Sequence, residues 1–233
     1  MKHLLLIALV ATSFSGFANA NNGIYASLKS GISDTKYKNS SDYYKAIDNN
    51  SDGLTFNNSN QTKSIYPTIS VAAGYDFSTI SPINARAELE YTYKDSTTFS
   101  PNIDSVTYNN TTEIFPYNLS LFESKLTTQS LMLNGYYDFK NQSKLTPYVS
   151  VGIGSTYVKN KQYATPKMSD NHITWSAGVG VTYSVLSNVS LDLSYRYVDA
   201  GKFNFDSTIN NEQLITKFKL ISNEYLLGLR YNF

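Results

Sequence analysis

The chain has 233 residues, with 19 Lys or Arg against 18 Asp or Glu, so its formal net charge at pH 7 is +1. A near-neutral chain lacks the basic surface that nucleic-acid binding requires, and we expect no nucleic-acid partner. It has no Cys, which excludes disulfides, thiolate metal sites and a Cys-linked lipid anchor.

The first twenty residues, MKHLLLIALVATSFSGFANA, have the three parts of a secretory signal peptide. Residues 2–3 are basic, residues 4–10 form an apolar core, and residues 18–20 form a small-x-small cleavage site. A retained membrane helix is the alternative, but the apolar run is too short to span a bilayer. We therefore predict cleavage after Ala20 and a single mature domain over residues 21–233.

Eight stretches of the mature chain alternate apolar and polar residues, and no stretch sustains helical spacing. Period two indicates a strand with one apolar and one polar face. No segment after the signal has 18 uninterrupted apolar residues, so we expect no membrane helix. The apolar faces comprise, in chain order, Ile24, Ala26, Leu28; Ile69, Val71, Ala73, Tyr75, Phe77; Ala85, Ala87, Leu89, Tyr91, Tyr93; Leu131, Leu133, Tyr137, Phe139; Val149, Val151, Ile153, Tyr157; Ile173, Trp175, Ala177, Val179, Val181, Tyr183; Val189, Leu191, Leu193, Tyr195, Tyr197; and Ile221, Tyr225, Leu227, Leu229, Tyr231, Phe233.

The expected connections alternate between long and short. In chain order they are 34–65, 78–83, 95–125, 140–145, 159–171, 186–188 and 199–219, of which the first, third and last are long and 159–171 is intermediate. Short periplasmic turns alternating with longer extracellular loops are typical of up-and-down outer-membrane barrels. We therefore predict an all-β fold, an eight-stranded antiparallel transmembrane β-barrel with long extracellular loops, surrounded by outer-membrane lipid and lipopolysaccharide.

The polar faces of the expected strands carry charged residues that would line the lumen. An eight-stranded lumen is just wide enough for side chains to fill, so we expect these charges to pair inside. The predicted network comprises Arg86, Glu88, Glu90, Asp192, Arg196, Glu224 and Arg230, and Lys94 shares their face. Small residues of the same parity leave room beside them: Gly74, Gly152, Gly154, Gly178 and Gly180.

The chain ends on LLGLRYNF, apolar or aromatic at every second position. Aromatic residues near strand ends are typical of a girdle at the membrane interface. Gly228, Tyr231 and Phe233 also resemble the C-terminal signal that the barrel assembly machinery recognises. We therefore predict that the barrel assembly machinery is a partner of the chain.

Several segments resemble the opacity (Opa) family of small outer-membrane barrels. They are GYDF (74–77), YYDF (136–139), TPYVSVGIG (146–154), SAGVGVTYSVLSNVSLDLSYRY (176–197) and LGLRYNF (227–233), and they cover strands and short turns. The broader OmpA-like and OmpX-like barrels share the architecture but fewer of these segments. The resemblance implies a surface-exposed antigen, also labelled porin-like, whose loops bind host-cell receptors.

The long connections 34–65, 95–125 and 199–219 are the expected functional surface, because binding residues concentrate on loops held by a rigid scaffold. The first is rich in Asn, Ser, Asp, Lys and Tyr, so we expect it to be mobile when unbound. Aromatic residues of the first two loops are candidate contacts with a host-cell receptor or glycan. They are Tyr37, Tyr43, Tyr44, Phe56, Tyr108, Phe115, Tyr117 and Phe122.

Three function classes are open: a surface adhesin, a small porin, channel or structural outer-membrane protein, and an outer-membrane enzyme. The enzyme hypothesis would rest on His172 with Asp170 and Ser169 in the third loop, but a lone His in a polar loop is ordinary. Glu88 and Glu90 fit a lumen ion network better than a glycosidase pair. We expect no catalytic site, no metal site and no cofactor.

Overall fold

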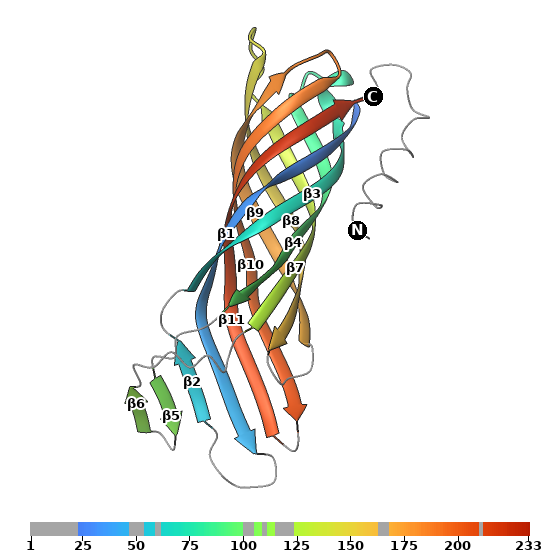
Figure 1. The fold of residues 1–233 in the computed structure, drawn as a ribbon. Helices are drawn as coiled ribbons and strands as arrows, with labels where there is room; N and C mark the ends of the chain where they lie inside the picture. The colour runs from blue at the N-terminus through green and yellow to red at the C-terminus, as the bar shows by residue number, and fades with distance from the viewer. Residues whose placement is uncertain are drawn as a thin grey trace.

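The computed structural model shows a closed antiparallel barrel (Figure 1). It describes residues 23–46, 54–58, 62–99, 105–108, 111–114, 124–162, 168–209 and 212–233. The predicted signal peptide lies outside the described residues, as do the tips of several predicted loops.

Eight long strands form the wall, which confirms the predicted fold. They are β1 (Ile24–Ala46), β3 (Thr62–Asp76), β4 (Ala85–Phe99), β7 (Ser124–Asp138), β8 (Leu145–Gln162), β9 (Met168–Ser184), β10 (Val189–Ile209) and β11 (Glu212–Asn232). Three short strands extend the sheet from the far end of β1: β2 (Leu54–Asn58), β5 (Ser105–Tyr108) and β6 (Thr111–Ile114). The one 3-10 turn in the described part is η1 (Phe77–Thr79), and no described helix is long and apolar enough to cross a membrane.

The pairing of β1 with β11 closes the barrel. It runs from Tyr25 opposite Asn232 to Ala46 opposite Glu212, and the amide of Phe233 donates to the carbonyl of Ile24 at 3.0 Å. A sheet in lipid needs such closure, because an open edge would leave backbone groups without hydrogen bonds. The two backbones lie close together at Gly31, where an added Cβ would lie 1.9 Å from the Tyr225 carbonyl oxygen.

The two ends of the barrel differ, and we call them the turn end and the extension end. At the turn end, drawn at the top of Figure 1 beside the C-terminus, short connections join β3 to β4, β7 to β8 and β9 to β10. At the extension end, β10 and β11 stay paired out to Ile209 opposite Glu212. The prediction of a long loop over 199–219 is therefore wrong, because this segment is a β-hairpin.

The other predicted loops are also shorter than expected. Strand β1 continues to Ala46 inside the predicted loop 34–65, and β8 and β9 extend into the predicted loop 159–171. The predicted loop 95–125 contains β5 and β6. These segments form strands because their backbones pair with neighbouring strands. In β1 and in the β10–β11 hairpin, the alternation places Tyr37, Phe203 and Phe218 inside the barrel rather than outside.

The lipid-facing parity agrees with the sequence pattern. Large apolar side chains on the outside are widely exposed, including Ile173 at 74%, Val151 at 67% and Leu193 at 59%. At the turn end, three strands each finish in an edge-to-face aromatic pair with ring centroids 5.2 Å apart. The pairs are Tyr75–Phe77, Tyr137–Phe139 and Tyr231–Phe233.

A β-bulge in β10 changes which residues face the lumen. The register shifts between Asp199 and Gly201, and Gly201 has a φ of 86°, a conformation that favours glycine. Before the bulge, even-numbered residues such as Arg196 are buried inside; after it, the buried residues are Phe203 and Phe205.

Replacement of Gly31 by Ala should weaken closure, because the new Cβ would clash with the β11 backbone. We expect the free energy of unfolding in detergent to fall by about 1–3 kcal/mol, the usual cost of overpacking. Gly135→Ala is the matched control, since a Cβ there meets nothing within 4 Å. Equal urea-unfolding curves for the two variants would contradict this view of the seam.

Candidate functional site

An unbroken chain of ion pairs crosses the lumen in the half nearest the turn end. Lys29 Nζ lies 2.5 Å from Glu88 and 2.6 Å from Glu90. Arg196 lies 2.6 Å from both Glu90 and Glu224, and Lys94 lies 2.6 Å from Glu224. The resulting order alternates in sign: Glu88, Lys29, Glu90, Arg196, Glu224, Lys94. All six side chains are buried, so each charge depends on its neighbours for compensation.

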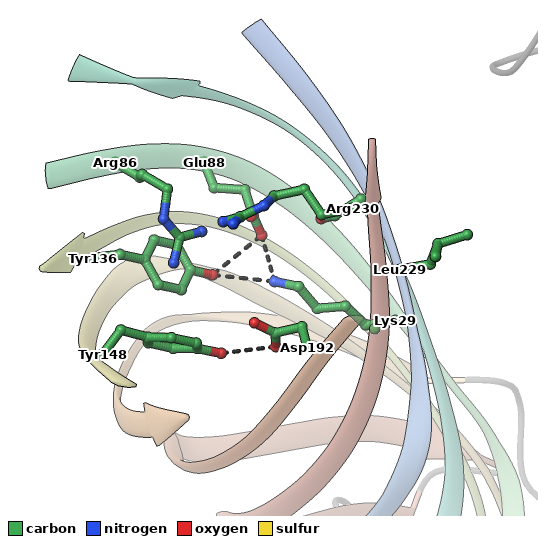
Figure 2. Close-up of a pocket in the computed structure, with 10 residues that line it drawn as sticks. Lys29, Arg86, Glu88, Tyr136, Tyr148, Asp192, Leu229 and Arg230 are labelled. Atoms are coloured by element: carbon green, nitrogen blue, oxygen red, sulfur yellow. Dashed lines mark hydrogen bonds and ion pairs between the residues drawn. The ribbon is translucent and has the colours of Figure 1, made fainter. Parts of the chain in front are cut away.

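A second polar group lies closer to the turn end, around a small cavity (Figure 2). Arg86 binds Asp138 through two hydrogen bonds of 2.7 and 2.9 Å, and its guanidinium lies 4.5 Å from the centre of the Tyr136 ring. The Tyr148 hydroxyl donates to Asp192 at 2.8 Å. Arg230 contributes a fifth lumen cation, with Nε and Nη1 lacking hydrogen-bond partners among the described residues.

Glycines make room for two of the lumen tyrosines. Tyr25 lies directly opposite Gly74, and Tyr148 lies opposite Gly180. An added Cβ at Gly74 would lie 2.2 Å from the Tyr25 ring, and one at Gly180 would lie 2.4 Å from the Tyr148 ring. Each ring therefore lies over the backbone of the neighbouring strand, in space that a larger residue than glycine would occupy.

The structure places all seven residues of the predicted charge network on the lumen side of their strands. Six are buried and Arg230 is half-buried. Sequence reasoning did not identify Lys29 and Asp138 as their partners, although both share the lumen parity of β1 and β7. With them, five cations meet five anions: Lys29, Arg86, Lys94, Arg196 and Arg230 against Glu88, Glu90, Asp138, Asp192 and Glu224.

A layer of hydroxyl side chains follows toward the extension end. Short cross-strand hydrogen bonds join Ser70 to Thr92 and Ser130 to Thr156, both at 2.8 Å. Lys94 links this layer to the ion pairs, since its Nζ also lies 3.3 Å from the Ser222 hydroxyl. Polarity thus declines along the lumen axis.

The part of the barrel between the hydroxyl layer and the extension end, which we call the extension, has a lumen filled by an apolar plug. Its members are Tyr37, Tyr66, Leu126, Val158, Ala200, Phe203, Phe205, Phe218 and Leu220. The Phe203 ring lies 5.8 Å from that of Phe218, which packs edge-on against Tyr37 at 5.7 Å. The prediction that Tyr37 is a loop contact is wrong, because its ring is buried in the plug and its hydroxyl bonds to that of Tyr66.

The other predicted loop contacts lie toward the extension end or outside the described residues. Tyr43 is half-exposed on β1, opposite Ile215. Tyr44, Phe56 and Tyr108 lie on β1, β2 and β5 rather than in loops, and their side chains are not described. The remaining three lie outside the described residues: Phe115, Tyr117 and Phe122.

The residues weighed for an enzyme do not form a catalytic arrangement in the described part of the chain. The exposed His172 packs edge-on against Phe203, with ring centroids 5.7 Å apart. The Asp170 carboxylate accepts instead from the backbone amides of Asn171 and Asn204, at 2.7 and 3.0 Å. Within the described ranges, no group of three or more His, Asp or Glu residues could hold a metal ion.

Comparison with known proteins identifies the family. The chain matches the outer membrane protein beta-barrel domain over residues 4–233. It belongs to this family. Its family and its fold together identify it as a β-barrel protein of the bacterial outer membrane.

Two related sequences and one solved structure agree with the assignment. Outer membrane protein PagN of Salmonella typhimurium is 30% identical over 250 aligned residues, covering 100% of both chains. A proposed adhesin of Rickettsia conorii is 28% identical over 127 residues, 47% of this chain and 50% of that protein. The structure of Neisserial surface protein A shares the fold, with a TM-score of 0.51 and 18% identity over 91% of this chain and 97% of that one.

Removal of Arg196 should destabilise the barrel, because Glu90 and Glu224 would each lose a buried partner. For Arg196→Met we expect a loss of about 3–5 kcal/mol in the free energy of unfolding, measured by urea titration in detergent. Adding Glu224→Gln restores charge balance and should recover part of that loss. Lys219→Met, which removes the half-exposed partner of Asp199, is the control and should cost less than Arg196→Met, because water reaches the Lys219 ammonium group. Equal losses for the two single variants would show that water screens the lumen charges.

The C-terminal assembly signal can be separated from simple loss of packing. Changing Tyr231 and Phe233 to Ser should lower outer-membrane levels in cells while refolding in detergent continues. Tyr137→Ser with Phe139→Ser removes an aromatic pair of the same geometry at the same end. Membrane levels measured by immunoblot should fall only for the terminal pair. A similar fall in both would assign the effect to packing.

Proposed function

We propose that this protein is a surface adhesin of opacity type, whose extension end contacts a host-cell receptor or glycan. The observation that carries the proposal is the extension itself, where the barrel wall continues past its apolar band around a packed interior. Binding residues concentrate on loops that a rigid scaffold supports, and this wall is such a scaffold. The name of the Rickettsia conorii relative supports the same function.

The proposal includes an orientation. Short turns of outer-membrane barrels face the periplasm and longer segments face the exterior, so the turn end would face the periplasm. Export by a signal peptide cleaved after Ala20 and insertion by the barrel assembly machinery complete the pathway. The protein would act by binding rather than by catalysis, with lipopolysaccharide and outer-membrane lipid around its wall.

A channel is the alternative, and the lumen contents disfavour it. Ion-paired side chains fill one half, and the apolar plug fills the extension, where Phe203 and Val158 are fully buried at 0% exposure. A conducting pore needs a continuous wet path, and apolar constrictions oppose the passage of ions.

Trimming the extension tests the adhesin proposal. One variant replaces 39–61 with a three-residue turn and 100–123 with a two-residue turn, which keeps the last barrel pairs Tyr37–Thr62 and Phe99–Ser124. A second variant replaces the same segments with Gly/Ser chains of equal length. Both should insert normally and lose adhesion to epithelial cells when displayed on a non-adherent bacterium.

Adhesion that survives in both variants would contradict the adhesin proposal. Planar-bilayer recordings on the same purified proteins supply the second measurement, and we expect no steady conductance from the full chain. Steady single-channel currents together with unchanged adhesion would favour the channel function.

A further inference from the structure

Lysines cover the outside of the extension where the apolar plug fills its inside. They alternate with plug residues along the strands, as in Lys36-Tyr37-Lys38, Lys202-Phe203 and Lys217-Phe218-Lys219. Because successive side chains of a strand point to opposite faces, these lysines face outward. We call this set the basic band. It comprises Lys36 and Lys38 on β1, Lys63 on β3, Lys202 on β10, and Lys217 and Lys219 on β11.

The strand register concentrates these charges. Lys219 lies directly opposite both Lys38 and Lys202, and Lys36 lies opposite Lys63. Like charges in directly opposite positions destabilise a sheet. Asp199 compensates Lys219 at 2.8 Å, but no other lysine of the band forms an ion pair with a described residue. Asp34 on β1 and Asp206 on β10 share the outward faces, but the lysines outnumber the carboxylates there, so the wall keeps a net positive charge.

The basic band begins where the apolar outer surface ends. Ile65 is 63% exposed on β3, and Lys63 follows two residues further out. Two residues span about 7 Å along a strand. Lysine stems can lie along apolar surface while their ammonium groups reach a polar layer. The band therefore lies at the depth of lipid headgroups rather than at the tip of the extension.

A second group of outward lysines lies on the opposite wall. Lys125 on β7 is opposite Lys161 on β8, and Lys159 is exposed two residues nearer the membrane. Positive charge on both walls fits an anion that surrounds the barrel, whereas a single protein partner would need only one side.

We propose that the basic band binds the phosphate groups of lipopolysaccharide in the outer leaflet. This inference rests on the orientation in the proposed function, but not on adhesion. A lipid A headgroup would bring its phosphates to the lysine rows from the side, while its acyl chains lie against the apolar wall below. A soluble sulfated glycan would more readily meet the tip of the extension.

The test uses the full mature chain refolded in detergent and titrated with bisphosphorylated lipid A or with dephosphorylated lipid A. We expect the native protein to prefer the phosphorylated form. Lys38→Gln with Lys202→Gln should weaken binding of that form about 25-fold, at roughly fivefold per lysine near an anionic surface. Binding of the dephosphorylated form should not change. The control, Lys140→Gln with Lys144→Gln, removes the same charge at the turn end and should bind like the native protein.

Three results would overturn the proposal. The first is equal affinity of the native protein for both lipid A forms, and the second is an equal loss of affinity in the test and control variants. The third is a Lys38/Lys202 variant that loses heparin binding while its lipid A binding stays intact. The last would assign the band to a soluble polyanion. The loop-trimmed variants retain Lys38 and Lys202, so they should keep lipid A preference even if adhesion is lost. Retained heat-modifiable mobility on gels checks that the lysine variants are folded.

Discussion

The need to leave no open strand edge in the membrane governs this protein. Closure is achieved by β1 and β11, the first and last strands, which pair along nearly their whole lengths. Eight strands close around a lumen that side chains must fill. An empty dry lumen would lose packing contacts, and water in so narrow a lumen would still need polar side chains to bind it. The composition of the lumen follows from that constraint.

Filling with charges succeeds here because the ions alternate in sign and are equal in number. Glu90 and Glu224 each lie between two cations, and Arg196 bridges them. Beyond the ion pairs, hydroxyl groups satisfy one another across strands, and the plug needs few polar contacts. The same lumen therefore changes from ionic to apolar along its axis, and the wall outside changes in the opposite sense, from apolar to basic.

That reversal explains how far the sequence could predict the structure. Within the apolar band, outward side chains such as Val151 and Leu193 repeat at every second position, and both the strands and the lumen face could be predicted from them. In the extension the same period continues with its faces exchanged, as in Lys36-Tyr37-Lys38, and its many polar residues indicated loops. Specific partners such as Lys29 and Glu88 could not be derived, because strand parity gives the face of a residue but not the stagger between distant strands.

The bulge at Asp199 and Gly201 has a consequence for how the protein can diversify. Since the register of β10 is already offset by one residue there, the part beyond the bulge aligns with the lumen independently of the part before it. A change of length at the far hairpin alters the outer half alone, while Arg196 and the buried ion pairs keep their positions. One strand thus serves two interiors, since it turns an even-numbered side chain, Arg196, into the ionic lumen and an odd-numbered one, Phe203, into the apolar plug.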